Sequence, residues 1–385
     1  MNIKDFKVER WLNLYENDAD YEMAETDVSP FTLKELLELG DFDHLKEQLL
    51  GIKLGYNPTS GSDKLKEAVA SLYQHNVKPE NILITTGAIE ADFHVTNSLV
   101  NKGDTVIVQF PAYQALYSTA EARGAKVKYW RMKPENEYKP DIDELKALID
   151  EKTKLIVLNI PHNPTGAVIS ETQLKTILKW AEEQDFYVLC DEVYHELALT
   201  KGIIPPYGRN LSKKAISVGS MSKAYGLSGL RLGWIAGPED LIQKSWGWKD
   251  YTSISNTPLS DFLAAFALVN REKVMQRNLA IARKNRKTLL EWFKQHEYFF
   301  DYILPEVGVL CFPRLRNIPI STEELCKKIF NEKKLLLVPG ECFDMPGHLR
   351  IGFGGDSNKF EICLSILSDY LNKNFKKIKK KIEIL

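Results

Sequence analysis

The amino-acid sequence predicts an α/β protein with a mostly parallel sheet, helices on both faces of that sheet, and a smaller α+β domain. Between about residues 81 and 237, short apolar runs alternate with helical stretches, which is the pattern of parallel strands joined by crossover helices. Beyond about residue 293, short strands mix with helices instead. A chain of 385 residues is also too long for one small core, so two domains are expected.

The two domains are expected to divide the chain unevenly. We assign residues 50–285 to the large domain, and residues 1–49 together with 286–385 to the small domain. The first fifty residues are mostly helical in pattern, and a capping box begins at Thr32.

Seven apolar runs predict the strands of the large sheet. They lie near residues 82–85, 105–109, 126–130, 155–159, 186–190, 215–219 and 232–236. The helices expected among them span residues 88–100, 113–123, 142–150 and 171–184. One long helical stretch, 259–293, leads out of the large domain. The small domain is completed by strands near 309–313 and 348–352 and by helices near 322–331 and 359–371.

The composition argues against several classes of partner. The 51 basic and 52 acidic residues give a formal net charge of −1, so neither nucleic acid nor an anionic membrane surface is expected as the main partner. No run is apolar and long enough to cross a bilayer. The lysine-rich stretch 373–381 is expected to be a solvated helix end. The five cysteines are scattered without metal-ligand spacing, which favours reduced thiols in a cytoplasmic protein and no metal site.

The segment 220–231 (Ser-Met-Ser-Lys-Ala-Tyr-Gly-Leu-Ser-Gly-Leu-Arg) directly follows a predicted strand. Lys223 lies among hydroxyl groups, and an amine that loses its proton near neutral pH is a good nucleophile for an aldehyde. Arg231 suits a phosphate, which its planar guanidinium can bind through two hydrogen bonds. Taken alone, the segment is equally compatible with a basic surface loop.

Two further motifs also follow predicted strands. Asn163-Pro164-Thr165-Gly166 comes after the apolar run 155–160, and Asp191-Glu192-Val193-Tyr194 comes after the run 186–190. Ligands of parallel sheets bind beyond the carboxyl ends of the strands, where these motifs are expected to meet. Together with 220–231, and in this order, they resemble the signature segments of fold-type I pyridoxal 5'-phosphate (PLP) enzymes, in particular the class I/II aminotransferases. The resemblance extends from about Leu54 to the end of the chain, and more weakly through the first fifty residues.

The resemblance implies PLP as cofactor and three catalytic residues. Lys223 matches the lysine that holds the aldehyde as a Schiff base and later moves a proton. Asp191 matches the aspartate at the pyridine nitrogen, where a carboxylate keeps the ring protonated. Tyr194, the third, matches the tyrosine that donates to the phenolic oxygen of the ring. Asn163 matches a cofactor-binding residue that contacts the same oxygen. The alternative for Asp191 is a turn or helix-capping carboxylate.

The resemblance also implies how the phosphate and the ring are bound. Exposed amides at the start of a helix favour an anion, and the family uses the position of Gly87, Ala88 and Ile89 for this purpose. Ser220, Ser222 and Arg231 match its side-chain phosphate ligands. Tyr113 matches the aromatic residue that stacks on the ring, and Tyr56 matches a tyrosine that reaches the cofactor phosphate of a partner subunit, which implies a homodimer with shared sites. As alternatives, Tyr113 is a core aromatic residue and Tyr56 packs within its turn.

The segment around Arg350 resembles the part of the family that binds the substrate α-carboxylate with help from Asn163; the alternative is a surface ion pair. Many relatives carry glycine in an N-terminal substrate segment that here reads Met-Ala-Glu-Thr-Asp at 23–27. Glu25 and Thr26 are therefore expected to face the substrate side chain. Our hypothesis is that Glu25, with Asp27 as second choice, receives a basic or polar group, and the alternative is that Glu25 caps or pairs locally.

The resemblance predicts an aminotransferase that moves the amino group of an L-amino acid, with a basic or polar side chain, to a 2-oxo acid by a ping-pong mechanism. A PLP-dependent lyase, cyclase or oxidase acting on an amino acid such as arginine is the alternative, because it would use the same cofactor site. A non-catalytic PLP-binding regulator is less well supported, because no helix-turn-helix segment precedes Tyr56. A nucleotide-binding protein would need a phosphate-binding loop or dinucleotide motif, which the sequence lacks.

Overall fold

A computed structural model describes residues 3–74 and 77–376 of the chain. Its centre is a seven-stranded sheet with the strand order β2-β8-β7-β6-β5-β3-β4. The strands are β2 (Ile82–Thr85), β3 (Thr105–Phe110), β4 (Lys126–Arg131), β5 (Thr153–Asn159), β6 (Tyr187–Asp191), β7 (Ala215–Ser220) and β8 (Gly233–Ala236). Strands β4, β3, β5, β6 and β7 are parallel neighbours, whereas β8 is antiparallel to both β7 and β2. The prediction of a mostly parallel sheet is confirmed.

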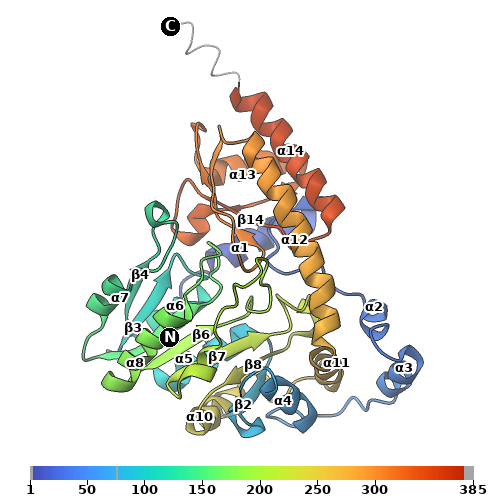
Figure 1. Cartoon of the computed structure of the whole chain (residues 1–385), viewed down its shortest axis with the longest axis vertical. Helices are drawn as coiled ribbons and strands as arrows, with labels where there is room; N and C mark the ends of the chain where they lie inside the picture. Colours follow the sequence, from blue (N-terminus) through green and yellow to red (C-terminus); the bar gives the residue numbers. More distant parts are fainter. Residues whose placement is uncertain (1–2, 75–76, 377–385) are drawn as a thin grey trace, which may run out of the picture.

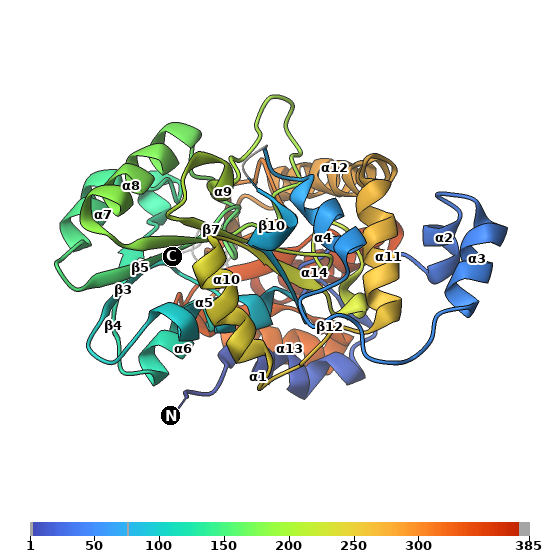
Figure 2. The same cartoon turned by 90° about the horizontal axis from the view of Figure 1, so that it is seen from below.

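Alternate side chains of the strands enter two separate hydrophobic cores, one on each face of the sheet. In β5, Leu155 and Val157 belong to one core, whereas Ile156 and Leu158 belong to the other. The first core includes residues of α5 (Ala88–Leu99), α6 (Ala115–Ala122) and α10 (Glu239–Lys249). The second includes residues of α4 (Asp63–Ala70), α7 (Ile142–Leu148), α8 (Glu171–Gln184) and α9 (Gly208–Leu211). Figure 2 shows the two helical layers on either side of the sheet.

Two helices, rather than one, lead out of the large sheet. The sequence predicted a continuous helical stretch over 259–293, but α11 (Pro258–Val269) and α12 (Arg271–Gln295) are separated at Asn270. Asn270 has non-helical backbone angles (φ −100°, ψ 23°), and its side-chain amide donates to the carbonyl oxygen of Phe266 at 3.0 Å. Asparagine competes for backbone groups in this way at helix ends. Helix α12 then runs from the large sheet into the smaller part of the molecule (Figure 1).

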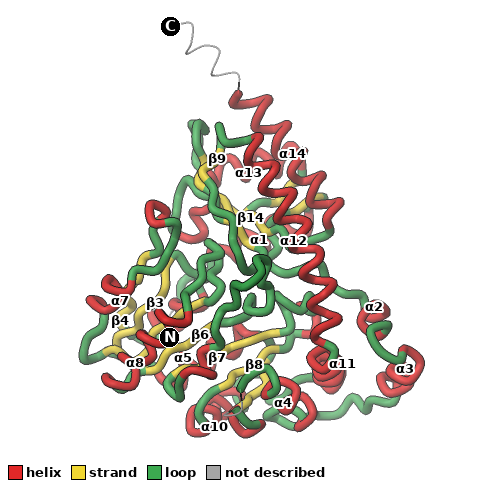
Figure 3. The backbone as a smooth tube through the Cα atoms, in the orientation of Figure 1, coloured by secondary structure: helices red, strands yellow, loops and turns green. Residues whose placement is uncertain are grey.

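The smaller part combines both ends of the chain. Helix α1 (Lys7–Tyr15) packs there because the indole of Trp11 donates to the Leu337 carbonyl at 2.8 Å. Strand β1 (Tyr21–Glu22) pairs in parallel with β12 (Leu335–Leu336). The other elements are β9 (Phe300–Asp301), β10 (Leu310–Cys311), β11 (Arg314–Leu315), α13 (Thr322–Lys333), β13 (Val338–Pro339), β14 (Leu349–Gly352) and α14 (Ser357–Phe375). Figure 3 shows these short strands surrounded by helices.

Helices α2 (Leu33–Leu37) and α3 (Phe42–Leu50) lie apart from the smaller part, on the far side of α11 and α12 (Figure 1). The predicted capping box at Thr32 is present at the start of α2. Our boundary at residue 285 falls inside α12, so the exact division into domains stays a prediction. Among the described residues, no helix is long and apolar enough to cross a membrane. Most of the lysine-rich stretch 373–381 lies outside the described residues.

Candidate active site

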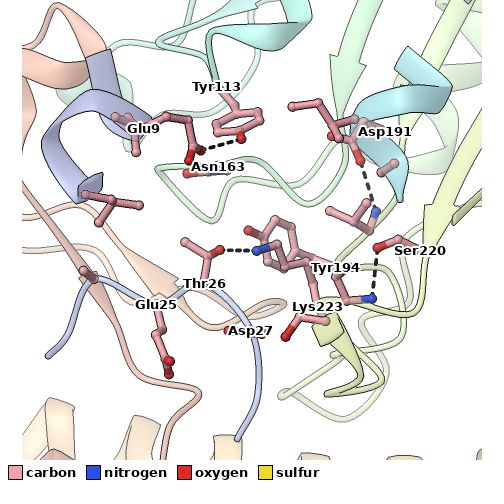
Figure 4. A pocket seen from close by; sticks show the side chains of 18 of the residues that line it. Glu9, Glu25, Thr26, Asp27, Tyr113, Asn163, Asp191, Tyr194, Ser220 and Lys223 are labelled. Carbon is pink, nitrogen blue, oxygen red and sulfur yellow. Dashed lines mark hydrogen bonds between the residues drawn. The ribbon is translucent and has the colours of Figure 1, made fainter. Parts of the chain in front are cut away.

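A cavity of about 550 Å³ opens at the carboxyl ends of β5, β6 and β7, beside the first turn of α5. The segment 22–27 and β14 border it from the smaller part of the molecule. Thirteen of the fifteen residues predicted for the site line this cavity: Glu25, Thr26, Ala88, Ile89, Tyr113, Asn163, Asp191, Tyr194, Ser220, Ser222, Lys223, Arg231 and Arg350. Figure 4 labels ten of the lining residues, which come from distant parts of the chain.

Lys223 extends from the turn after β7 into this cavity. Its ammonium nitrogen Nζ donates to Thr26 Oγ1 at 2.5 Å, so the N-terminal segment contacts the lysine directly (Figure 4). Burial lowers the pKa of Lys223; the charges of Asp27 and Glu9 raise it again in part, while Arg350 adds to the lowering. A buried lysine with a lowered pKa has more of the neutral amine that nucleophilic attack and proton abstraction need.

Asp191 ends β6 with its carboxylate directed into the cavity. Burial raises the pKa of this carboxyl group to about 7, while the hydrogen bond from the Val193 amide at 3.3 Å and the charge of Lys223 oppose the shift. The backbone of Asp191 is held by Asn159, whose side-chain amide donates to the Asp191 carbonyl at 3.0 Å. A carboxylate in such a place is stabilised by a cationic ligand group.

Arg350 on β14 is a buried cation that forms no ion pair with any of the residues that the structure describes. Only 2% of its surface is exposed. Its Nη2 donates to the Ala24 carbonyl at 2.9 Å and its Nη1 to Asn163 Oδ1 at 3.5 Å, while Nε has no partner among the described residues. Burial lowers the pKa of this guanidinium. A buried charge normally has a counter-ion, so this arrangement favours a bound carboxylate.

Two glycines explain why the segment 23–27 lies against Arg350. A Cβ atom at Gly352 would overlap the carbonyl oxygen of Glu25, and one at Gly354 would overlap that of Asp27. The amide of Gly352 donates to the Met23 carbonyl at 2.8 Å. Only glycine allows two backbones to approach so closely.

A second anion site lies at the N-terminus of α5. Gly87 is its N-cap residue, with φ 79°, and no side chain caps the first amides. A Cβ atom at Gly87 would lie 2.8 Å from Arg231 Nη2, so the arginine packs over this glycine. Ser220 Oγ accepts from the Ser222 amide at 3.2 Å on the neighbouring turn. Helix amides, two hydroxyl groups and one guanidinium together match a phosphate group.

Two tyrosines face the space between the anion sites. The Tyr113 hydroxyl donates to Glu9 Oε1 at 2.7 Å, and burial raises its pKa. Tyr194 is buried as well, and burial likewise raises its pKa, so both hydroxyl groups keep their protons at neutral pH. Protonated phenols can donate hydrogen bonds to a ligand oxygen.

The mouth of the cavity is acidic. Glu25 is exposed there, and its pKa is raised to about 8 by partial burial, by a hydrogen bond with Glu22 and by the charges of Glu22 and Asp27. Asp27 is only 8% exposed, and its carboxylate has no hydrogen bond or ion pair with the described residues. A cationic group of a ligand would relieve this repulsion.

Two predicted site residues do not line the cavity. Gly87 lies behind Arg231, as described above. Tyr56 is 88% exposed in the extended stretch before α4, away from the cavity of its own chain. Its predicted contact with a partner subunit stays a prediction.

The sequence prediction missed Glu9, Asp92 and Asn159, which also line the cavity. Glu9 has no sequence signal, because it lies on a charged helix distant in sequence from every motif. The sequence does contain a signal for Asp92, because it is an acidic residue among the apolar positions of the helix that follows Gly87. It also contains a signal for Asn159, because this residue is the last of a predicted strand.

Comparison with known proteins agrees with this geometry. Residues 9–367 match the model of the family "Aminotransferase class I and II". The chain is 32% identical to capreomycidine synthase of Streptomyces vinaceus, over 94% of this chain and 93% of that protein. It is 27% identical to an aspartate aminotransferase of Pyrococcus abyssi, over 89% and 93% of the two chains.

Solved structures show the same similarity. A PLP-dependent aminotransferase from Streptococcus suis 89-1591 superimposes with a TM-score of 0.92, at 35% identity over 97% of this chain and 99% of that one. A PLP-dependent cyclase, OrfR, superimposes with a TM-score of 0.89, at 25% identity over 97% and 98%. The cofactor of the family is pyridoxal 5'-phosphate, and the phosphate-type site at α5, the buried Lys223 and the Asp191 carboxylate fit it. The chain therefore belongs to the class I and II aminotransferase family.

Proposed function

We propose that the protein is a PLP-dependent aminotransferase that moves the amino group of an L-amino acid, with a basic or polar side chain, to a 2-oxo acid in a ping-pong reaction. One observation carries the proposal. The amine of Lys223 and the unpaired guanidinium of Arg350 line the same cavity, so a single amino acid can offer its Cα–H to one and its carboxylate to the other.

The residues of this chain would hold the cofactor at both ends. The amides of Ala88 and Ile89 and the side chains of Ser220, Ser222 and Arg231 would bind the phosphate. Asp191 would face the ring nitrogen, and Tyr113 would lie against the ring. When bound, PLP supplies an electron sink for the electrons released at the substrate Cα.

Arg350 and Asn163 would orient the substrate. The free Nε–H of Arg350 gives the substrate carboxylate a donor that no described protein group uses. Asn163 Oδ1 holds the guanidinium from the other side, at 3.5 Å. Fixing the carboxylate fixes which Cα bond points at Lys223, and this choice selects the reaction.

Lys223 would accept and move the Cα proton of the substrate. Burial lowers the pKa of its amine, which favours the neutral form that accepts the Cα proton. Thr26 Oγ1, 2.5 Å from Nζ, would hold the amine in place. Tyr194 and Asn163 would donate to the phenolic oxygen of the cofactor.

The side chain of the substrate would meet the acidic mouth of the cavity. Glu25 and Asp27 both line it, as does Glu9, whose charge reaches Lys223 and Arg350. A guanidinium or ammonium group there would relieve the mutual repulsion of these carboxylates. This supports a basic donor.

A second candidate function is a PLP-dependent cyclase, lyase or oxidase that acts on an amino acid such as arginine. Its support is the 32% identity to capreomycidine synthase over 94% of this chain and the structural similarity to the cyclase OrfR. The cofactor site and Lys223 would be the same in either reaction, because both begin with removal of the Cα proton.

A single turnover separates the two candidates. PLP-loaded protein is mixed, without air and without a 2-oxo acid, with each of the twenty amino acids, and the products are identified by mass. An aminotransferase releases one equivalent of 2-oxo acid and retains the amino group on the cofactor, so the active donor is named directly. A cyclised or dehydrated product, or product only after air is admitted, establishes the second candidate instead.

The control is Lys223→Ala, loaded with PLP in the same way. We expect turnover to fall by at least about a thousandfold, because the general base is lost, while the phosphate site still retains the cofactor. Full turnover in this variant would show that Lys223 is not the base.

A further inference from the structure

Lys249, the last residue of α10, is a buried cation that the proposed reaction does not use. Its exposed fraction is 0%, and it does not line the cavity of the candidate active site. Burying an ammonium group is unfavourable unless all of its hydrogen bonds are made. The partners of this ammonium therefore show which part of the molecule it stabilises.

Three oxygen atoms surround the Lys249 ammonium. Its Nζ donates to the carbonyl oxygen of Thr59 at 2.5 Å, to that of Ile84 at 2.8 Å and to Asn256 Oδ1 at 3.0 Å. The side-chain nitrogen of Asn256 points elsewhere, because it donates to the Thr85 carbonyl at 2.9 Å. All three neighbours of Nζ are thus acceptors, and only a charged ammonium has three N–H groups to donate to them. Burial lowers the pKa of Lys249 to about 8, which still leaves it mostly charged at pH 7.

These hydrogen bonds lie directly before the phosphate-type site in the chain. Ile84 and Thr85 are the last two residues of β2, and Gly87 is already the N-cap of α5. Thr86, between them, donates its amide to Glu90 Oε2 at 2.5 Å. A side chain therefore holds the backbone of each residue from 84 to 86. The direction in which the first amides of α5 point depends on this turn.

The segment that follows α10 supports the same turn from a second side. The Thr252 hydroxyl donates to Glu90 Oε1 at 2.6 Å, and Asn256 lies four residues farther along. Between them, the amide of Ile254 donates to the Lys249 carbonyl at 3.0 Å, and Ile254 has a left-handed φ of 62°. A β-branched residue adopts this conformation only where its surroundings enforce it. The segment 249–256 is therefore held in one conformation against the turn.

We propose that Lys249 is a positioning residue for the phosphate group of PLP. Its ammonium fixes the turn between β2 and α5, directly through Ile84 and indirectly through Asn256 and Thr85, and so directs the first amides of α5 at the phosphate. Because Lys249 lies outside the cavity, it touches neither cofactor nor substrate. The inference requires PLP binding but not transamination, so its failure is distinguishable from a failure of the proposed function.

The test compares the binding of PLP with that of pyridoxal, which has the same ring and aldehyde but no phosphate group. Both dissociation constants are measured by equilibrium dialysis and cofactor absorbance, without any substrate. The side chain in Lys249→Met has a similar length but donates no hydrogen bond, so the dissociation constant of PLP should rise at least about tenfold. That of pyridoxal should change less than about threefold, because pyridoxal does not use the phosphate site.

Lys244→Met is the matched control on the same helix. Lys244 is exposed and forms an ion pair with Asp240 at 3.8 Å. Its replacement changes the net charge by the same amount as Lys249→Met but leaves the turn intact. Both dissociation constants should therefore stay within about twofold of the wild-type values.

Asn256→Ala provides a second variant that retains the ammonium. It removes the hydrogen bond to Thr85 and one of the three acceptors of Lys249. The dissociation constant of PLP should rise about three- to tenfold, again without a matching change for pyridoxal. Thermal melts of the cofactor-free proteins establish which variants are folded, and Asn256→Ala decides the question if Lys249→Met is not.

Three results would overturn the inference. If the folded variants weaken PLP and pyridoxal binding equally, Lys249 supports the cavity in general and not the phosphate turn. If they leave the PLP dissociation constant unchanged, the turn does not depend on these hydrogen bonds. If Lys244→Met weakens PLP binding as much as Lys249→Met does, the loss of one positive charge explains the effect.

Discussion

At the residue scale, Arg350 favours binding of a carboxylate at the expense of the stability of the empty protein. A buried guanidinium with no counter-ion destabilises the empty protein, and a bound carboxylate removes that penalty. In Arg350→Met we expect kcat/KM for the amino donor to fall by roughly a hundredfold or more, because the charge-assisted hydrogen bonds to the carboxylate are lost. The thermal midpoint of the cofactor-free protein should stay the same or rise.

The matched control is Arg316→Met. Arg316 forms an exposed ion pair with Asp301 at 2.9 Å, and neither residue lines the cavity. Both kinetics and melting should remain close to wild type there, because exposed ion pairs contribute little. A large fall in the melting temperature of Arg350→Met would contradict the interpretation of Arg350 as an unpaired site charge.

We expect the KM values of basic amino donors to depend on pH through the ionisation of Glu25. Its pKa of about 8 means that it is mostly protonated at pH 7 and becomes ionised as the pH rises to 9. The KM of a basic donor should therefore fall about two- to fivefold from pH 7 to 9, since the attraction for its cation grows at this exposed position. The KM of a neutral donor should lack this fall.

Glu25→Gln supplies the comparison. Glutamine cannot ionise, so the KM values of basic and neutral donors should respond alike to pH in this variant. An unchanged pH dependence, or an unchanged preference between basic and apolar donors, would assign the effect to another carboxylate, such as Asp27.

Sequence reasoning identified the residues that follow strand ends, because motif and strand lie together in the chain. Lys223, Asp191 and Asn163 meet at one edge of the sheet as parallel topology requires. Glu9 could not be found in this way, because its contact with Tyr113 joins residues 104 positions apart through the packing of α1. Side-chain contacts between distant helices have no local pattern.

At the element scale, strand β14 and the segment 23–27 depend on each other. In Gly352→Ala the new methyl group would overlap the Glu25 carbonyl, so the segment must move and Thr26 must leave Lys223. We expect a loss of about 2 kcal/mol or more in the free energy of unfolding, together with a raised KM. Chemical denaturation and steady-state kinetics measure the two effects.

Gly247→Ala in α10 is the control for a glycine replaced without crowding. No atom lies within 4 Å of its added Cβ, so the variant should be unchanged or slightly more stable, as alanine favours helices. If both glycine variants behaved alike, the close approach of the two backbones would not be decisive.

Elements were predicted well where apolar periodicity was long and poorly where one polar residue decided the outcome. Apart from the edge strand β4, the strands of the sheet are almost entirely buried apolar runs, and their positions follow from the local sequence. The break between α11 and α12 depends on the backbone angles of Asn270. One asparagine within a helical pattern is not enough to predict such a break from the sequence.

At the scale of the whole molecule, we propose a homodimer with shared sites. The support is Tyr56, which is 88% exposed, does not line the cavity of its own chain, and follows the exposed Leu50 and Leu54 in the sequence. Such apolar exposure is typical of a surface covered by another chain. The resemblance places the hydroxyl of Tyr56 at the cofactor phosphate of the partner.

Subunit mixing tests this arrangement. Tyr56→Ala and Lys223→Ala homodimers should each be weakly active, but a heterodimer would unite an intact Lys223 with the partner's intact tyrosine in one site. Random reassortment should therefore restore roughly a quarter of the wild-type sites. No recovery, despite verified heterodimers, would place Tyr56 within its own subunit.

The crowding of residues 23–27 against Gly352 and Gly354 also bears on how this protein could evolve. The path of the segment is set by two glycines, whereas the side chain of Glu25 is exposed and lines the cavity. Libraries randomised at position 25 should yield many folded enzymes with new donor preferences, and libraries at 352 and 354 should yield few. Adaptation to another amino acid is thus open at position 25 and closed at the two glycines.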